Sequence, residues 1–140
     1  MALTLEERQS FLAQPHIGAL AVNNRPGRAP LTVPIWYQYS PGGELWVLTG
    51  PESQKMRLLK ESGRFSLMVE VLEPTVRYVT VEGPITRVTP MTDAQHHEMA
   101  ARYLPADKVD GYLKYAESIG PQSAVFMSPE HWLSADMGAF

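Results

Sequence analysis

Apolar and polar residues alternate along six stretches of the chain, the pattern expected of strands that bury one face. Turns containing Gly, Pro and Asn separate the first three stretches and predict hairpins between them. The Gly83-Pro84 pair inside the fifth stretch predicts a bend or bulge where the sheet curls. The predicted strands are 16–22, 28–39, 44–49, 65–71, 76–88 and 122–127, followed by a final extended segment at 129–133.

Four short helices are predicted between and beside these strands. Thr4 with Glu7, and Thr92 with Gln95, have the spacing of a capping box, in which the two residues satisfy each other's backbone N–H groups. Gly63 is placed to end a helix, because glycine adopts the left-handed conformation at that position readily. The predicted helices are 4–13, 53–61, 92–102 and 105–117.

The order of these elements predicts a mainly β fold, a six-stranded and mostly antiparallel barrel with short helices packed outside it. The chain has 140 residues, of which 44% are hydrophobic. A chain of this size and composition can bury one sizeable core, so residues 1–140 are expected to form a single domain.

Composition excludes several classes of function. The formal net charge is −3, and the twelve Lys and Arg residues are spread along the chain, so the basic patch of a nucleic-acid-binding protein is missing. The lack of cysteine excludes a disulfide scaffold, a thiolate metal site and a cysteine nucleophile. No apolar run approaches the length of a membrane span, and the N-terminus lacks a signal-peptide pattern. We therefore expect a soluble, unexported, cytoplasmic protein that has neither nucleic acid nor membrane as a partner.

Three residues at the start of the predicted helix 53–61 form a candidate anion site. Ser53, Lys55 and Arg57 lie in its first turns, where free backbone N–H groups and the helix dipole favour a negative charge. Cations at this end oppose the dipole by a few tenths to about 1 kcal/mol, so their presence favours a compensating anionic ligand. Taken alone, the pattern leaves open the alternative that Ser53 only caps the helix and both cations are solvated.

The predicted strand 28–39 adds a candidate aromatic slot. Pro34 lacks a backbone donor and is typical of a sheet edge or of a place where a sheet opens. Trp36 shares a face with Pro34, and an opening beside it would suit a planar ring. Tyr37 and Tyr39 lie at alternate positions with core residues and are interpreted as barrel wall.

The remaining polar candidates are interpreted as structural. Glu70 and Glu73 are expected to be solvated carboxylates near a turn, so no acid-base pair is identified. The neighbouring His96 and His97 would point about 100° apart on a helix, so they are not expected to share a metal ion. His16 and His131 stand alone near strand segments and are expected to be structural, and no metal site is predicted.

Four segments carry a resemblance that covers nearly the whole chain. They are 30–37, 48–50, 53–58 and 77–83, with the sequences PLTVPIWY, LTG, SQKMRL and RYVTVEG. In this order they resemble the pyridoxamine 5'-phosphate oxidase-like split-barrel superfamily, and most of all the flavin and deazaflavin oxidoreductases abundant in actinobacteria. The resemblance implies an FMN-binding type of split barrel and a homodimer with its cofactor sites between the subunits.

The resemblance also implies roles for individual residues. Pro34, Ile35 and Trp36 would line the ring and ribityl region of a cofactor, with Leu48 and Thr49 beside the ring edge. The phosphate would be held by the segment containing Ser53, Lys55, Met56 and Arg57. Arg77 and Tyr78 would lie on a strand that faces the dimer cleft. Trp132 lies near the C-terminus, where the partner chain often contributes an aromatic residue to the cofactor site.

The activity implied is hydride transfer to a small hydrophobic conjugated substrate. Deazaflavin coenzyme F-420 is the favoured cofactor and FMN the alternative. Oxidation of vitamin B6 is not expected, since the C-terminal segment 136–140 lacks the arginine and histidine pattern used by pyridoxamine phosphate oxidases. A non-catalytic carrier of the same cofactor would need the same phosphate site and ring slot, so the sequence leaves that alternative open.

Overall fold

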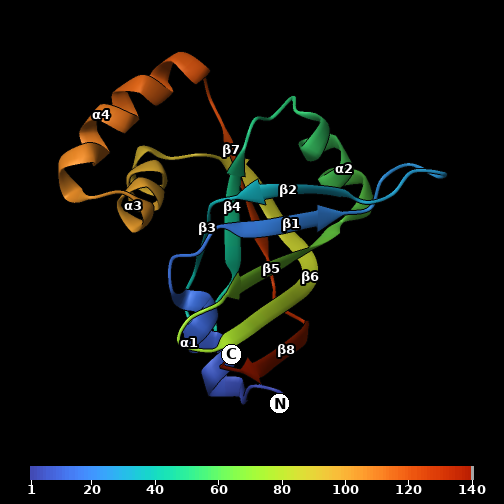
Figure 1. Ribbon diagram of the computed structural model, residues 1–140. Coiled ribbons are helices and arrows are strands. Elements are labelled where there is room, and N and C mark those ends of the chain that lie inside the picture. Colours follow the sequence, from blue (N-terminus) through green and yellow to red (C-terminus); the bar gives the residue numbers. More distant parts are fainter. Residues whose placement is uncertain (140) are drawn as a thin grey trace.

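The computed structural model describes residues 1–139 and confirms a mainly β fold with short helices outside a curled sheet (Figure 1). The sheet has eight strands, so the expected number of six is wrong. The strands are β1 Gly18–Val22, β2 Leu31–Ile35, β3 Tyr37–Tyr39, β4 Leu45–Thr49, β5 Arg64–Val71, β6 Val76–Pro90, β7 Ser123–Met127 and β8 His131–Gly138.

Two local differences account for the strand number. The predicted strand 28–39 is interrupted at Trp36, so that β2 and β3 pair with different neighbours. The final extended segment is a full strand, β8, which pairs along β6. Alternation of buried and exposed positions continues across Trp36, so the sequence pattern carries no sign of the interruption.

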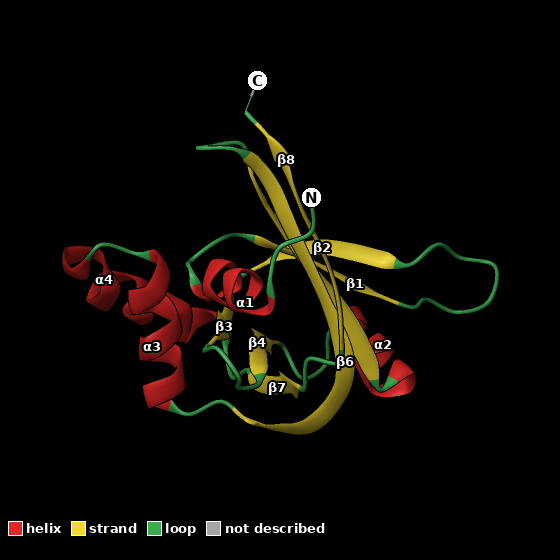
Figure 2. Cartoon of the chain, turned by 90° about the horizontal axis from the view of Figure 1, so that it is seen from below, coloured by secondary structure: helices red, strands yellow, loops and turns green. Residues whose placement is uncertain are grey.

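The helices lie close to their predicted positions: α1 Leu5–Ala13, α2 Gln54–Ser62, α3 Asp93–Tyr103 and α4 Ala106–Ala116, with a 3-10 turn at Glu117–Ile119. Both predicted capping boxes are present. Ser53 is the N-cap of α2, and Gly63 ends this helix with a φ of 71°. Figure 2 shows α3 and α4 together on one side of the strands and α2 on the opposite side.

The strand order explains why the sheet forms a split barrel. The order is β2-β1-β5-β6-β7-β4-β3, so β2 and β3 stand at its two ends. Only Trp36 separates these two strands in sequence, which forces the two ends of the sheet to meet there. The barrel is therefore nearly closed, and its split lies at Trp36. Pro34 belongs to the end strand β2, where the donor it lacks is not needed.

The long strand β6 joins the two halves of the barrel. Its first part pairs with β5 and β8, and its last part pairs with β7. A register irregularity between Ile85 and Arg87 marks the passage, close to the bend predicted at Gly83-Pro84. The inner face buries the core, and the predicted wall residues Tyr37 and Tyr39 are 0% and 2% exposed. Within residues 1–139, every helix is too short or too polar to cross a membrane.

Candidate functional site

A cleft of about 400 Å³ opens at the split of the barrel. Its strand wall comprises Pro34, Ile35 and Trp36 from the split itself, with Leu48 from β4 and Ile17 before β1. Its opposite wall comes from α3 and α4, and Gln122, just before β7, also lines it; the residues of this part are His96, Met99, Ala100, Tyr112 and Gln122. Four of the predicted site residues therefore lie together in one cleft.

Tyr103, the last residue of α3, holds the split in place. Its hydroxyl lies 2.7 Å from the carbonyl oxygen of His16 and accepts a hydrogen bond of 3.1 Å from the N–H of Tyr37. The ring of Tyr103 stacks on Trp36 with 4.7 Å between the ring centroids. Tyr112 also packs against Trp36, with 5.6 Å between the ring centroids, so only the part of Trp36 that these two rings leave open is available to the cleft.

Arg102 anchors the same end of α3. Its guanidinium donates hydrogen bonds of 2.8 Å to the carbonyl oxygens of Ala13 and Gln14 and to the side-chain oxygen of Gln38. Carbonyl oxygens at the C-terminal end of a helix have no intrahelical N–H donor. Arg102 therefore supplies donors to the carbonyl oxygens at the end of α1, and it also bonds a side chain of β3. The helical wall of the cleft is therefore fixed to the barrel.

The start of α2 joins the cleft through the end of β4. Thr49 directly follows the cleft residue Leu48, and its hydroxyl lies 3.3 Å from that of Ser53. The Ser53 hydroxyl donates to the carbonyl oxygen of Gly50 at 3.0 Å and accepts from the N–H of Met56 at 3.1 Å. Thr49 also pairs with Ser123, the neighbour of the cleft residue Gln122. The predicted anion site is therefore connected to the cleft residues Leu48 and Gln122 through Thr49.

The first turn of α2 retains donors without acceptors. Helix geometry gives the N–H groups of Gln54 and Lys55 no intrahelical partner, and none is found elsewhere in residues 1–139. The Lys55 side chain is half-buried, and burial lowers the pKa of its ammonium group. Arg57 is exposed, and neither cation forms an ion pair within the described chain. This is a cationic site without its own counter-ion.

Met56 differs from the other predicted residues of this segment. Its side chain is 1% exposed and belongs to the hydrophobic core, and its N–H donates a hydrogen bond to the Ser53 hydroxyl. The side chain of Thr49 is also buried, at 5% exposure, and it faces Ser53 rather than the cleft. Both residues support the site from within rather than lining it.

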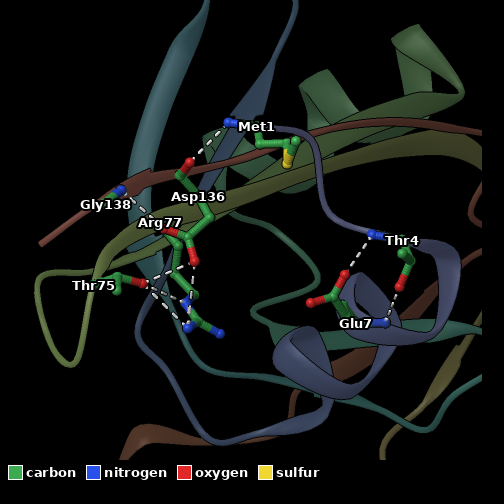
Figure 3. A network of polar contacts seen from close by, with 7 residues as sticks. All are labelled: Met1, Thr4, Glu7, Thr75, Arg77, Asp136 and Gly138. Atoms are coloured by element: carbon green, nitrogen blue, oxygen red, sulfur yellow. Dashed lines mark hydrogen bonds and ion pairs between the residues drawn. The ribbon is translucent and has the colours of Figure 1, made fainter.

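Arg77 and Tyr78 lie on β6 and do not line the cleft. The Arg77 guanidinium is 3.6 Å from the carboxylate of Asp136 and donates to the Thr75 hydroxyl (Figure 3). The same carboxylate accepts from the N–H of Gly138 and from the Thr75 hydroxyl, and these bonds together with Arg77 lower the pKa of Asp136. Within one chain these contacts hold β8 to β6, so a cofactor role for Arg77 or Tyr78 would require a second chain.

Trp132 also stands apart from the cleft. Its ring packs edge-on against Tyr39, and the guanidinium of Arg8 lies 4.8 Å from its centroid. The pair of β8 with β6 places Trp132 opposite Val81. As for Arg77, its predicted contact with a cofactor depends on an arrangement of two chains.

The sequence interpretation missed the residues from α3 and α4. His96 lines the cleft, and its ring packs edge-on against Tyr112 with 5.8 Å between centroids. Helical spacing could have identified it, because His96 shares a face with Met99 and Ala100, which are buried, whereas His97 is exposed. Because neighbouring residues on a helix point about 100° apart, one histidine can face the cleft while the next faces solvent.

The other histidines are structural or solvent-facing. His16 Nε2 lies 3.0 Å from the carbonyl oxygen of Phe11, and its ring stacks on that of Phe11. Burial lowers the pKa of His16. His131 is exposed beside Glu130. Within residues 1–139 no three acidic, histidine or cysteine side chains converge in a way that could hold a metal ion.

The chain was compared with families of known proteins, with curated proteins and with solved structures. The family described as pyridoxamine 5'-phosphate oxidase matches residues 4–135. No curated protein matches the chain.

Solved structures show the same fold. A conserved hypothetical protein from Mycobacterium tuberculosis superposes with a TM-score of 0.72 at 21% identity, over 97% of this chain and 86% of the other. A structure described as an F420 reductase has a TM-score of 0.69 at 25% identity, over 89% and 94% of the two chains. A FAD-binding protein from Mesorhizobium loti has a TM-score of 0.62 at 18% identity, over 96% and 93%.

Proposed function

The chain belongs to the pyridoxamine 5'-phosphate oxidase family, and on this premise we propose that it is an oxidoreductase that uses a phosphorylated flavin-type cofactor. The favoured cofactor is the deazaflavin coenzyme, with FMN as the alternative. The substrate proposed is a small, hydrophobic, conjugated molecule. The similarity to an F420 reductase along 94% of that chain supports the choice of deazaflavin.

One observation carries the proposal: Lys55 is half-buried beside the cleft without an anionic partner in residues 1–139. Removing an ammonium from water is unfavourable unless an opposite charge compensates for it. A phosphate at the start of α2 would supply that charge and accept from the N–H groups of Gln54 and Lys55. The donor set therefore fits a phosphate, and the adjoining cleft is within the size range of ligand pockets.

The protein residues would bind and orient such a cofactor. A flavin or deazaflavin supplies the hydride-transfer chemistry when bound, so the protein needs no catalytic triad. Ser53 and Thr49 fix the start of α2, Lys55 and Arg57 hold the phosphate, and Pro34 and Trp36 border the ring. The apolar walls exclude water from the reacting groups.

A side-by-side titration tests the proposal. Full-length protein is titrated with FMN and with the deazaflavin coenzyme, and binding is followed by the change in cofactor fluorescence. We expect saturable binding of at least one of them, tighter for the deazaflavin. Saturation by neither cofactor would contradict the proposal. Oxidation of the reduced cofactor by a panel of enones and quinones then separates an enzyme from a carrier, because a carrier gives only the rate of the protein-free control.

A homodimer is also part of the proposal. A mostly apolar row, in which Thr80 is the polar member, crosses the outer face of the sheet. Pro34 lies opposite Ala19, Ala19 opposite Met68, Met68 opposite Thr80 and Thr80 opposite Leu133. Met68 is 38% exposed and Leu133 63%. Pro34 also lines the cleft, so this outer row is continuous with the proposed cofactor site. A second copy of the chain on the row would exclude water from its apolar side chains.

Substitution within the outer row should separate the two copies. We expect sedimentation equilibrium to give the mass of two chains for the natural protein and of one chain for Met68→Glu combined with Leu133→Glu, since buried like charges repel. Tyr115→Glu on α4, where Tyr115 is 67% exposed, is the control and should remain dimeric. A single-chain mass for the natural protein at micromolar concentration would exclude the dimer.

A further inference from the structure

The antiparallel pairing of β1 with β2 stops where the cleft begins. The last pair on this side is Gly18 with Ile35. Continuation of the same register would add two further pairs: Ile17 with Trp36, and His16 with Tyr37. Within residues 1–139 no backbone hydrogen bond joins either pair, and both members of the first one line the cleft instead. The cleft therefore opens at the point where the ladder between the two strands is broken.

The hydroxyl of Tyr103 lies in the gap of this ladder. It accepts a hydrogen bond of 3.1 Å from the N–H of Tyr37 and donates one of 2.7 Å to the carbonyl oxygen of His16. In a hydrogen-bonded antiparallel pair, such an N–H would donate directly to the opposite carbonyl oxygen. One side-chain oxygen from α3 thus takes the place of a direct bond between the two strands.

The position of this hydroxyl is fixed by the contacts of its ring. The ring of Tyr103 stacks on Trp36 with an interplanar angle of 17°, and the guanidinium of Arg102 lies 5.6 Å from its centroid. The same guanidinium donates to the carbonyl oxygens of Ala13 and Gln14 at the end of α1. The end of α3 is therefore fixed to the barrel, and it holds the hydroxyl between the two strands.

Building on the proposed function, we propose that the Tyr103 hydroxyl is a spacer that keeps this ladder open, so that Ile17 and Trp36 form an edge against which the cofactor ring binds. Tyr103 does not line the cleft and is a positioning residue in this assignment. Without the hydroxyl the Tyr37 N–H loses its acceptor, and an unpaired buried donor favours conformations in which the edge is displaced. The apparent affinity for a ring then falls with the fraction of molecules that retain the edge.

Hydrogen exchange of the Tyr37 amide tests the spacer without a ligand. In the full-length natural protein, nuclear magnetic resonance should show slow exchange, because Tyr37 is 0% exposed and its N–H is hydrogen-bonded. Tyr103→Phe keeps the ring that stacks on Trp36 but removes the hydroxyl, and it should accelerate this exchange at least tenfold. Tyr115→Phe removes a hydroxyl from an exposed position on α4 and is the matched control, which should leave the rate unchanged.

A second test compares each cofactor with its phosphate-free form, riboflavin for FMN and the corresponding phosphate-free deazaflavin for the coenzyme. Binding is followed by fluorescence titration. We expect Tyr103→Phe to weaken the phosphorylated and the phosphate-free form by the same factor, roughly three- to tenfold, since the change concerns the ring alone. Tyr115→Phe should leave these affinities unchanged. A residue that only stabilises the fold would lower the free energy of unfolding with no change in affinity.

Each outcome decides for or against Tyr103. Fast exchange of the Tyr37 amide in the natural protein overturns the spacer, as does an unchanged rate in Tyr103→Phe. Unchanged affinities in the folded variant, or a loss confined to the phosphorylated forms, overturn the role in ring binding. Circular dichroism confirms that each variant is folded.

Two further outcomes are separated by measurements on the natural protein. If Tyr103→Phe does not fold, a nuclear Overhauser effect between the Tyr37 amide and the Tyr103 ring protons supports the spacer, and its lack overturns it. Failure of the proposed function appears as a lack of FMN and deazaflavin binding by the natural protein. Exchange of the Tyr37 amide still decides on the spacer in that case, because it needs no cofactor.

Discussion

Gly83→Ala should be the most destabilising single substitution of a glycine in this chain, lowering the free energy of unfolding by roughly 3 kcal/mol or more. A Cβ atom at Gly83 would overlap the carbonyl oxygen of Ser128 and lie 2.8 Å from its carbonyl carbon. Backbone cannot rotate away as a side chain does, so the connection between β7 and β8 would have to move. Urea denaturation followed by circular dichroism measures the loss.

The reason for so close an approach is visible in the hydrogen bonds on either side of Gly83. Ser128 donates to the carbonyl oxygen of Pro84 at 3.0 Å, and Glu130 donates to that of Glu82 at 2.8 Å. Displacing the connection would weaken both bonds where β6 passes between the barrel halves. Gly111→Ala is the control: its Cβ meets nothing within 4 Å on the exposed side of α4, so it should stabilise by about 0.5–1 kcal/mol. Equal stability of Gly83→Ala and the natural protein would contradict the prediction.

Local signals in the sequence were sufficient for most elements of the fold. The capping boxes at Thr4 and Thr92, the N-cap at Ser53 and the helix end at Gly63 each depend on residues within one turn, and all are present. The interruption of the strand at Trp36 depends instead on Tyr103, which is 66 residues from its hydrogen-bond partner Tyr37. A contact between residues so far apart in sequence leaves no local pattern. The sequence therefore predicted one strand where the structure has two, β2 and β3.

The candidate site likewise has one part that local sequence patterns predict and one part that depends on long-range contacts. Its strand wall and the start of α2 are close in sequence. Pro34, Trp36 and Ser53 could be selected from local patterns in this short segment, and the family resemblance added Leu48, which lines the same cleft as Pro34 and Trp36. The opposite wall was missed because its position depends on how α3 and α4 pack across the split, anchored through Arg102 to carbonyls 88 and 89 residues away. His96 therefore resembled an ordinary surface histidine until the two helices were placed over the barrel.

Replacing both Lys55 and Arg57 with alanine should weaken the binding of FMN and of the deazaflavin coenzyme tenfold or more. Charge-assisted hydrogen bonds contribute about 1.5–3 kcal/mol each, and the half-buried Lys55 should account for most of the loss. Arg57 is exposed, so screening by solvent reduces its share. The dissociation constants of the natural protein and the variant are compared by fluorescence titration.

A charge-matched control distinguishes a phosphate contact from general attraction. Lys60→Ala combined with Arg28→Ala removes the same number of cations from exposed positions, one in the last turn of α2 and one in the β1–β2 connection. Long-range attraction between exposed charges is screened at physiological salt, so this control should change the dissociation constants less than twofold. If both double variants weaken binding equally, the start of α2 attracts the cofactor only through net charge. If neither does, the phosphate is held elsewhere, and the unpaired burial of Lys55 needs another cause.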